Sequence, residues 1–86
     1  MYVIIAYDVN AARTQIFKKI CQQFLGRIQN SVFEGKLTVA QFRELKDELA
    51  ESINKDEMLR IWEIADNQIM KIHTLGTPKI EEGNVL

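Results

Sequence analysis

The residue near the start of this chain that could do chemistry is Asp8, which follows an apolar run at residues 1–7. That run is rich in β-branched and aromatic side chains, which is typical of a buried β-strand. A helical pattern begins after Asn10, so we expect Asp8 at a strand-to-helix corner, where functional groups are commonly displayed. One carboxylate does not perform general acid–base chemistry alone, so Asp8 needs a partner.

Two interpretations of Asp8 are open from the residues. As an acid close to the first turn of a helix, it would stabilise the helix dipole. As one of two Asp8 side chains brought together in a dimer, it would have a raised pKa or would recruit a cation. Mg²⁺ suits such a pair, because this cation takes one or two carboxylates together with water and phosphate oxygens.

Basic residues gather in the first half of the chain: Arg13, Lys18, Lys19, Arg27 and Lys36. One interpretation is an ordinary solvated helix face. The other is a patch that contacts phosphate groups, because arginine pairs with phosphate through two hydrogen bonds. The chain has 11 basic and 12 acidic residues, so nucleic-acid binding would require such a local patch.

The other residues of chemical interest favour structural roles. His73 has no second histidine with which to share a metal, and Cys21 lies on the apolar side of a predicted helix. A chain with a single cysteine forms neither an intrachain disulfide nor a cysteine-based zinc site, which favours a reducing compartment. We expect Trp62 and Phe33 in the core or in an interface rather than at a base-stacking platform.

A chain of 86 residues predicts one domain. At this length a protein buries roughly 60–65% of its unfolded surface, so a second protomer would add stability. We expect neither a signal peptide nor a transmembrane helix, because the run 1–7 is short and no basic region precedes it. The expected location is therefore the cytoplasm.

Hydrophobic periodicity predicts the elements that position these residues. An amphipathic helix is expected over about residues 11–25, with Asn10 as its N-cap and Gly26 as its stop. Residues 27–37 then change to a two-residue period, which indicates one long bent strand or two short ones. The bend or bulge is expected at residues 29–31, because Asn and Ser favour local side-chain hydrogen bonds.

The second half of the chain repeats this alternation. Thr38 and Gln41 form a capping-box pattern at the start of a helix that should end near Ile53. We expect three further elements: a strand over residues 58–64, a polar turn around residues 66–68, and a strand over residues 71–75 that ends before Pro78.

This order predicts an α+β, ferredoxin-like βαββαβ sandwich with an additional C-terminal strand. Residues 1–76 would form the domain, and residues 77–86 would be a C-terminal extension. Two helices would cover one face of an antiparallel sheet. The first strand is apolar on both sides, so the other face also needs a cover, which a sheet-to-sheet homodimer would supply. The extension could then be a strand exchanged onto the edge of the partner's sheet.

Three segments resemble the CRISPR-associated Cas-two family, the small subunit of spacer acquisition. They are the strand end Tyr7-Asp8-Val9, the central motif at residues 27–35, and the helix start Leu37-Thr38. The resemblance extends over nearly the whole chain, including the predicted strand at residues 60–64. It implies a ferredoxin-like homodimer that binds duplex DNA and bridges two dimers of the CRISPR integrase.

The resemblance also implies site residues. Asp8 would bind Mg²⁺ or Mn²⁺, paired across the dimer axis, with Arg27 and Phe33 in supporting positions. Arg13 falls where the family often has a basic residue early in its first helix. Some family members are described as metal-dependent nucleases acting on single-stranded RNA or double-stranded DNA. This chain departs from the family pattern in lacking charged residues directly after Asp8 and in having Asn30 where many members have tyrosine.

Three functions are therefore open. The first is a DNA-binding adaptor whose contact patch comprises Arg13, Lys18, Lys19 and Arg27. The second is a Mg²⁺-dependent endonuclease that uses Asp8, and the third is a non-catalytic dimeric interaction or toxin-like module, because fold does not determine function. The resemblance favours an enzyme that hydrolyses ester bonds. The residues favour the adaptor, because one carboxylate without a nearby histidine provides no general base.

Overall fold

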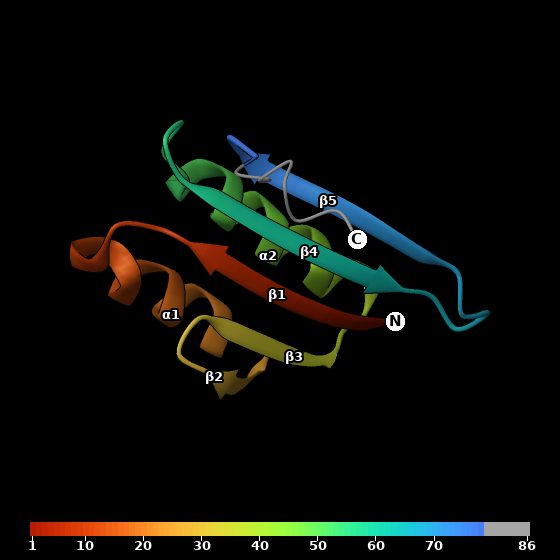
Figure 1. Ribbon diagram of the computed structural model, residues 1–86. Helices are drawn as coiled ribbons and strands as arrows, with labels where there is room; N and C mark the ends of the chain where they lie inside the picture. The colour runs from red at the N-terminus through yellow and green to blue at the C-terminus, as the bar shows by residue number, and fades with distance from the viewer. Residues whose placement is uncertain (79–86) are drawn as a thin grey trace.

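The computed structural model describes residues 1–78, in which two helices lie on one face of an antiparallel sheet (Figure 1). The elements are β1 (Tyr2–Asp8), α1 (Thr14–Gln22), β2 (Gly26–Gln29), β3 (Val32–Lys36), α2 (Val39–Ser52), β4 (Met58–Ile64) and β5 (Met70–Gly76). The strands lie in the order β2-β3-β1-β4-β5, and each neighbouring pair is antiparallel. The expected α+β class, the two helices and the additional strand after β4 are confirmed.

The central strand β1 separates two apolar faces. Val3, Ile5 and Tyr7 are buried, whereas Tyr2, Ile4 and Ala6 are only partly buried and Asp8 is exposed. Successive side chains of a strand point to opposite faces, so the buried set faces the helices. The same division applies to β4, in which Leu59 and Ile61 are fully buried.

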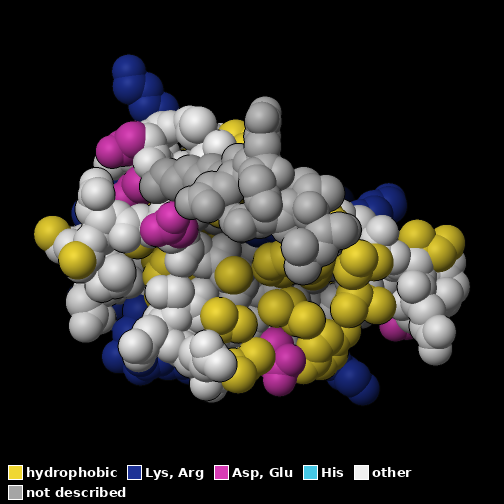
Figure 2. All heavy atoms as spheres, viewed as in Figure 1, with side chains coloured by type: hydrophobic (Ala, Val, Ile, Leu, Met, Phe, Trp, Pro, Cys, Tyr) yellow, Lys and Arg dark blue, Asp and Glu magenta, His cyan; other side chains and the backbone are white. Residues whose placement is uncertain are grey.

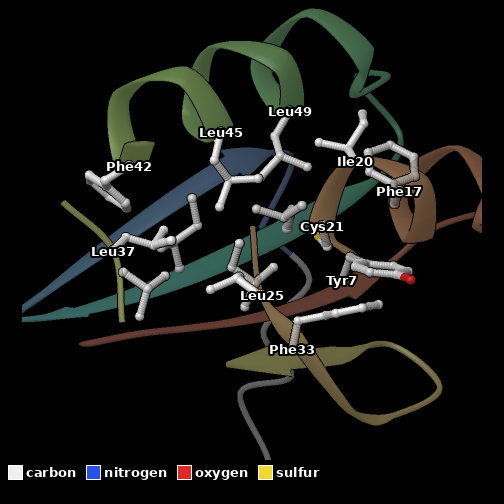
Figure 3. Packing of buried hydrophobic residues seen from close by; sticks show 14 residues of the cluster. Tyr7, Phe17, Ile20, Cys21, Leu25, Phe33, Leu37, Phe42, Leu45 and Leu49 are labelled. Atoms are coloured by element: carbon white, nitrogen blue, oxygen red, sulfur yellow. The ribbon is translucent and has the colours of Figure 1, made fainter. Parts of the chain in front are cut away.

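The core lies between the sheet and the helices (Figure 3). Its helical members are Phe17, Ile20 and Cys21 of α1 and Phe42, Leu45 and Leu49 of α2. Figure 3 shows the Tyr7 ring between Phe17 and Phe33, with ring centroids 5.5 and 6.2 Å from those partners. The core therefore joins α1 to β1 and β3.

The first helix is shorter than expected. A 3₁₀ turn at Ala11–Arg13 precedes α1, and α1 ends at Gln22 rather than near residue 25. The prediction of Asn10 as a side-chain N-cap is wrong, because its side chain makes no capping hydrogen bond. Its main-chain carbonyl instead accepts from the amide of Arg13 at 2.8 Å.

Gly26 does not stop the helix, because it begins β2. The chain leaves the helix earlier, at a turn in which the Leu25 amide donates to the carbonyl of Cys21 at 2.8 Å. Leu25 is only 7% exposed and belongs to the core. The helix therefore ends before Gly26, which lacks the positive φ of a glycine that stops a helix.

The remaining boundaries agree closely with expectation. Residues 27–37 form two short strands rather than one, separated by a turn at residues 30–31, and the β2–β3 register shifts between Arg27 and Gln29. The capping box of α2 is present, since the Thr38 hydroxyl accepts from the Gln41 amide and the Gln41 side chain accepts from the Thr38 amide. The turn at residues 66–67 and the following strand are also observed.

The face of the sheet away from the helices carries an apolar groove of about 370 Å³. It is lined by Ile4, Ala6, Val32, Trp62, Ile64 and Met70. Figure 2 shows hydrophobic side chains gathered over the strands on this side. Residues 1–78 thus form a sheet that is apolar on both faces but has helices on only one.

Two predictions from the sequence concern the C-terminal extension and membrane-spanning helices. Most of the extension at residues 77–86, with its exchanged strand, lies outside the described residues, which end at residue 78. Neither helix in the described range is long and apolar enough to cross a membrane.

Candidate functional site

Asp8 is the last residue of β1, and it is exposed. In the ladder with β4 it lies opposite Met58. By the two-residue period of the strand, Asp8 shares a face with Ile4 and Ala6, which line the apolar groove. The carboxylate therefore stands beyond Ala6 on the side of the sheet that has no helices.

The donor set around Asp8 fits a metal only in part. Residues 1–78 contain no group of three or more His, Cys, Asp or Glu side chains that could hold a metal ion. Mg²⁺ and similar cations accept one or two carboxylates when water and phosphate oxygens complete the shell. A site formed by two Asp8 side chains would take the second one from another copy of the chain.

Arg13 is engaged within the protein. Its Nε donates to Oε2 of Glu57 at 2.8 Å and its Nη2 donates to Oε1 at 3.2 Å, while Nη2 also reaches the carbonyl of Ser52 at 2.6 Å. Glu57 is 1% exposed. The hydrogen bond from Arg13 lowers the pKa of Glu57, and the same bond raises the pKa of Arg13. The two residues form a bidentate ion pair next to the loop that follows Asp8.

Glu57 is the residue that sequence reasoning missed. Its partner is 44 positions away in the chain, and no local pattern links the two. The sequence offers no signal that links the two residues, because Asp8 is the acid nearest to Arg13 in the chain.

A polar recess of about 260 Å³ lies between α1 and the β2–β3 turn. It is lined by Tyr7, Thr14, Gln15, Lys18, Arg27, Asn30 and Ser31. Two of these residues are cations and none is an acid. The Arg27 guanidinium donates to the Asn30 side chain and to the carbonyl of Gln29. The recess brings Lys18 and Arg27 together and can accept phosphate oxygens, whereas Lys19 is exposed on α1 outside it.

Tyr7 separates this recess from Asp8. Its hydroxyl donates to the carbonyl of Asn30 at 3.4 Å, and its ring is buried against Phe33. Burial raises the pKa of Tyr7. Because Tyr7 and Asp8 are consecutive in a strand, the recess and the Asp8 carboxylate lie on opposite sides of β1. Phe33 is fully buried, as expected for a core residue.

The residues expected to be structural are found in structural positions. His73 Nε2 lies 2.8 Å from Glu63 Oε1, and His73 Nδ1 lies 3.4 Å from Lys46 Nζ, which ties β5 to α2. Cys21 is fully buried, and burial raises the pKa of its thiol to about 12. Trp62 lines the apolar groove on the open face of the sheet.

Comparison with known proteins identifies the family. The family model for CRISPR associated protein Cas2 matches residues 1–72. The chain belongs to this family. The resemblance that the motifs around Asp8 and Phe33 indicated is therefore confirmed.

The similarity to individual Cas2 proteins covers most of the chain. The CRISPR-associated endoribonuclease Cas2 of Methanosarcina acetivorans is 36% identical over 87 residues and covers 100% of both chains. That of Thermotoga maritima is 37% identical over 84 residues, covering 96% of this chain and 97% of the relative. Among solved structures, Streptococcus pyogenes Cas2 at pH 6.5 superposes with a TM-score of 0.68 at 32% identity, covering 78% of this chain and 89% of that one. A second Cas2 crystal structure gives a TM-score of 0.64 at 32% identity, covering 94% of this chain and 80% of the other.

Proposed function

We propose that this Cas2 family protein is a homodimeric, DNA-binding adaptor of CRISPR spacer acquisition that bridges two integrase dimers. The observation that carries the proposal is the apolar groove formed by Ile4, Ala6, Val32, Trp62, Ile64 and Met70. A sheet that is apolar on both faces needs a cover on each face. A second copy of the chain is a self-complementary cover, because the same patch then meets itself across a two-fold axis.

The distribution of charge supports a DNA contact on the side of α1. Lys18 and Arg27 meet at the polar recess, Lys19 is exposed nearby, and residues 9–33 include no acid. By contrast, exposed acids lie along α2 at Glu44, Asp47 and Glu51. Phosphate groups are attracted to the first surface and repelled by the second. The duplex would therefore lie over α1 and the β2–β3 turn.

A second candidate function is metal-dependent cleavage of RNA. Its support is the position of Asp8, exposed at the end of β1 on the face that a second protomer would cover, together with the name endoribonuclease given to the relatives. A Mg²⁺ or Mn²⁺ ion held by two Asp8 side chains would supply charge stabilisation to a phosphodiester. The adaptor remains the better-supported function, since one carboxylate per chain is a sparse catalytic set.

The adaptor proposal is tested by the salt dependence of duplex DNA binding. The triple variant Lys18→Gln, Lys19→Gln and Arg27→Gln should bind more weakly, and the slope of log affinity against log salt should fall by about 0.9 for each phosphate that the protein no longer neutralises. The control triple variant Arg43→Gln, Lys55→Gln and Lys71→Gln removes the same charge from exposed positions elsewhere. It should leave the slope unchanged.

Two results would contradict the proposal. Equal slopes in wild type and the first triple variant would remove α1 and the recess from the DNA interface. A wild-type protein that is dimeric but does not bind duplex DNA would instead favour the third possibility, a non-catalytic interaction or toxin-like module.

A further inference from the structure

We infer that Arg13 and Glu57 are positioning residues for Asp8, which hold the loop after Asp8 against the start of β4. Nothing in the sequence motifs assigns a role to Glu57. The functional value of this positioning rests on the proposed role of Asp8, whereas the positioning itself is measurable without nucleic acid or metal.

The Glu57 carboxylate is the centre of the contact. Oε2 accepts from Arg13 Nε at 2.8 Å and from the Asn10 amide at 3.4 Å, and Oε1 accepts from the Asn54 amide at 3.0 Å and from Arg13 Nη2 at 3.2 Å. With 1% exposure, this carboxylate has little access to water that could replace a missing donor. A buried charge requires hydrogen-bond partners, so these bonds hold the loop after Asp8 firmly against Glu57.

The contact begins where the β1–β4 ladder ends. The last pair of that ladder is Asp8 with Met58. The next attachment between the two segments is the bond from the Asn10 amide, two residues after Asp8, to the side chain of Glu57, one residue before Met58. The path of the chain leaving Asp8 is therefore set by Glu57, and with it the orientation of the Asp8 backbone.

Glu57 also joins this loop to two other segments. Its main-chain carbonyl accepts from the Thr77 amide at 2.8 Å, directly after β5. Arg13 Nη2 donates to the carbonyl of Ser52, the last residue of α2. Three parts of the fold thus meet at the Arg13–Glu57 pair, which links the loop after Asp8 to the end of β5.

This arrangement assigns Arg13 a different role from Lys18 and Arg27. The Arg13 side chain is 26% exposed, and its guanidinium already pairs with a carboxylate that is 1% exposed. A phosphate could use Arg13 fully only by leaving Glu57 as an unpaired buried charge. Removal of the Arg13 charge should therefore loosen the loop after Asp8 without weakening any bond to phosphate.

The test uses the full-length protein in three readouts: amide hydrogen exchange by NMR, the Asp8 carboxyl carbon shift, and the salt slope of DNA binding. Glu57→Gln and Arg13→Gln should each speed exchange at the Asn10 amide by about tenfold or more, while the central β1 amide of Ile5 is unaffected. Both variants should shift the Asp8 carboxyl signal, and Arg13→Gln should keep the wild-type salt slope.

Glu63→Gln is the matched control. It breaks another partly buried pair, Glu63 with His73 at 2.8 Å, on β4 near the opposite end from Met58. It should leave exchange at Asn10 and the Asp8 signal unchanged. If either single variant fails to fold, the double variant Arg13→Gln with Glu57→Gln, which leaves no buried charge unpaired, is measured in its place.

Unchanged exchange at Asn10 would overturn the inference. A slope lowered by about 0.9 in Arg13→Gln would also overturn it, because Arg13 would then contact a phosphate. A wild-type protein that does not bind DNA would contradict the proposed function alone, since the exchange and chemical-shift results would still decide the role of Glu57.

Discussion

Tyr7 and Asp8 are neighbours in the chain, but their side chains point to opposite faces of the sheet. Tyr7 faces the helices and lines the basic recess, whereas Asp8 follows Ile4 and Ala6 on the open face. The cations in that recess are therefore separated from the Asp8 carboxylate of the same chain. The second Asp8 of the proposed metal site would come from a partner across the open face, and the proposed phosphate contacts of Lys18 and Arg27 would not require it.

The first prediction at this scale concerns Asp8→Asn, which removes the charge and keeps the shape. Spacer integration in the presence of the integrase should persist, because the adaptor depends on the dimer and on the basic surface. Any RNA cleavage that the wild-type protein shows should disappear in this variant, because Mg²⁺ is typically held by carboxylates. Both activities are measured beside Asp47→Asn, an exposed acid of α2.

The two activities answer separate questions. RNA cleavage retained in Asp8→Asn would refute the metal site at this residue. Integration that fails in Asp8→Asn but persists in Asp47→Asn would contradict a purely architectural role.

The second prediction concerns the stability conferred by Glu57. Its pKa is lowered in the folded protein, chiefly by the hydrogen bond from Arg13, so its stabilising effect is full above the unfolded value of about 4.3 and is lost as pH falls through the lower folded value. Near neutral pH, Glu57→Gln should lower the free energy of unfolding by about 1–3 kcal/mol, since it removes the charged hydrogen-bond partner of Arg13.

Urea denaturation at neutral pH and at successively lower pH, until the folded carboxyl is also protonated, measures this effect. The difference between wild type and Glu57→Gln should shrink in acid, where the wild-type carboxyl is protonated as well. Glu44→Gln, at an exposed site on α2, should change stability by less than about 0.5 kcal/mol. A difference that does not depend on pH would mean that the charge of Glu57 is not what stabilises the fold.

At the scale of elements, the two helices present surfaces of opposite charge. Both bury an apolar face on the same side of the sheet, yet α1 carries basic residues without an acid, and α2 carries most of the exposed acids of the helical layer. The strand β5 is held at its end by a close approach to the start of β4. Gly76 adopts a φ of +77°, and a Cβ at that position would overlap the carbonyl oxygen of Glu57.

The third prediction follows from this approach. Gly76→Ala should destabilise the protein by roughly 1–3 kcal/mol, because it combines an unfavourable φ with an overlap against main chain. Gly26→Ala is the control, since a Cβ there would lie in ordinary contact, 3.7 Å from the main-chain oxygen of Glu34. Thermal unfolding of the two variants compares them directly, and equal midpoints would contradict the close approach of β5 to Glu57.

At the scale of the whole molecule, the open face of the sheet is the dominant feature. Ile4, Trp62 and Ile64 line a groove opposite the helices, and Met70 and Ile72 of the edge strand are 53% and 52% exposed. Large exposed apolar patches on soluble proteins commonly mark interaction sites. In the proposed dimer Asp8 would lie near the interface, because it shares a face of β1 with Ile4 and Ala6, which line the groove.

The fourth prediction tests that dimer. Ile64→Lys places a charge in the groove and should shift the protein from dimer to monomer, because an unpaired charge in an apolar interface is strongly unfavourable. Val39→Lys is the control, since Val39 is 62% exposed on α2, on the helical side. Sedimentation equilibrium measures both, and a dimer that persists in Ile64→Lys would exclude the groove as the interface.

Local patterns were sufficient for most of the fold. The two-residue period of β1 and β4 and the capping box at Thr38 predict their elements correctly, because these signals arise between residues that are close in the chain. The end of α1 was predicted wrongly for the converse reason. The helix ends at Gln22, and Leu25 packs in a core that includes strand residues distant in sequence, such as Ile61.

The sequence by itself determined the order of the elements, the family and the place of Asp8 at the end of a strand, since each depends on residue types at short spacing. Only the tertiary structure decided that Arg13 pairs with Glu57 and that Lys18 meets Arg27 at one recess on the helical side of the sheet. These residues come into contact only when the strands and helices assemble into the folded domain. Pairing across such separations depends on register and packing, which no local pattern specifies.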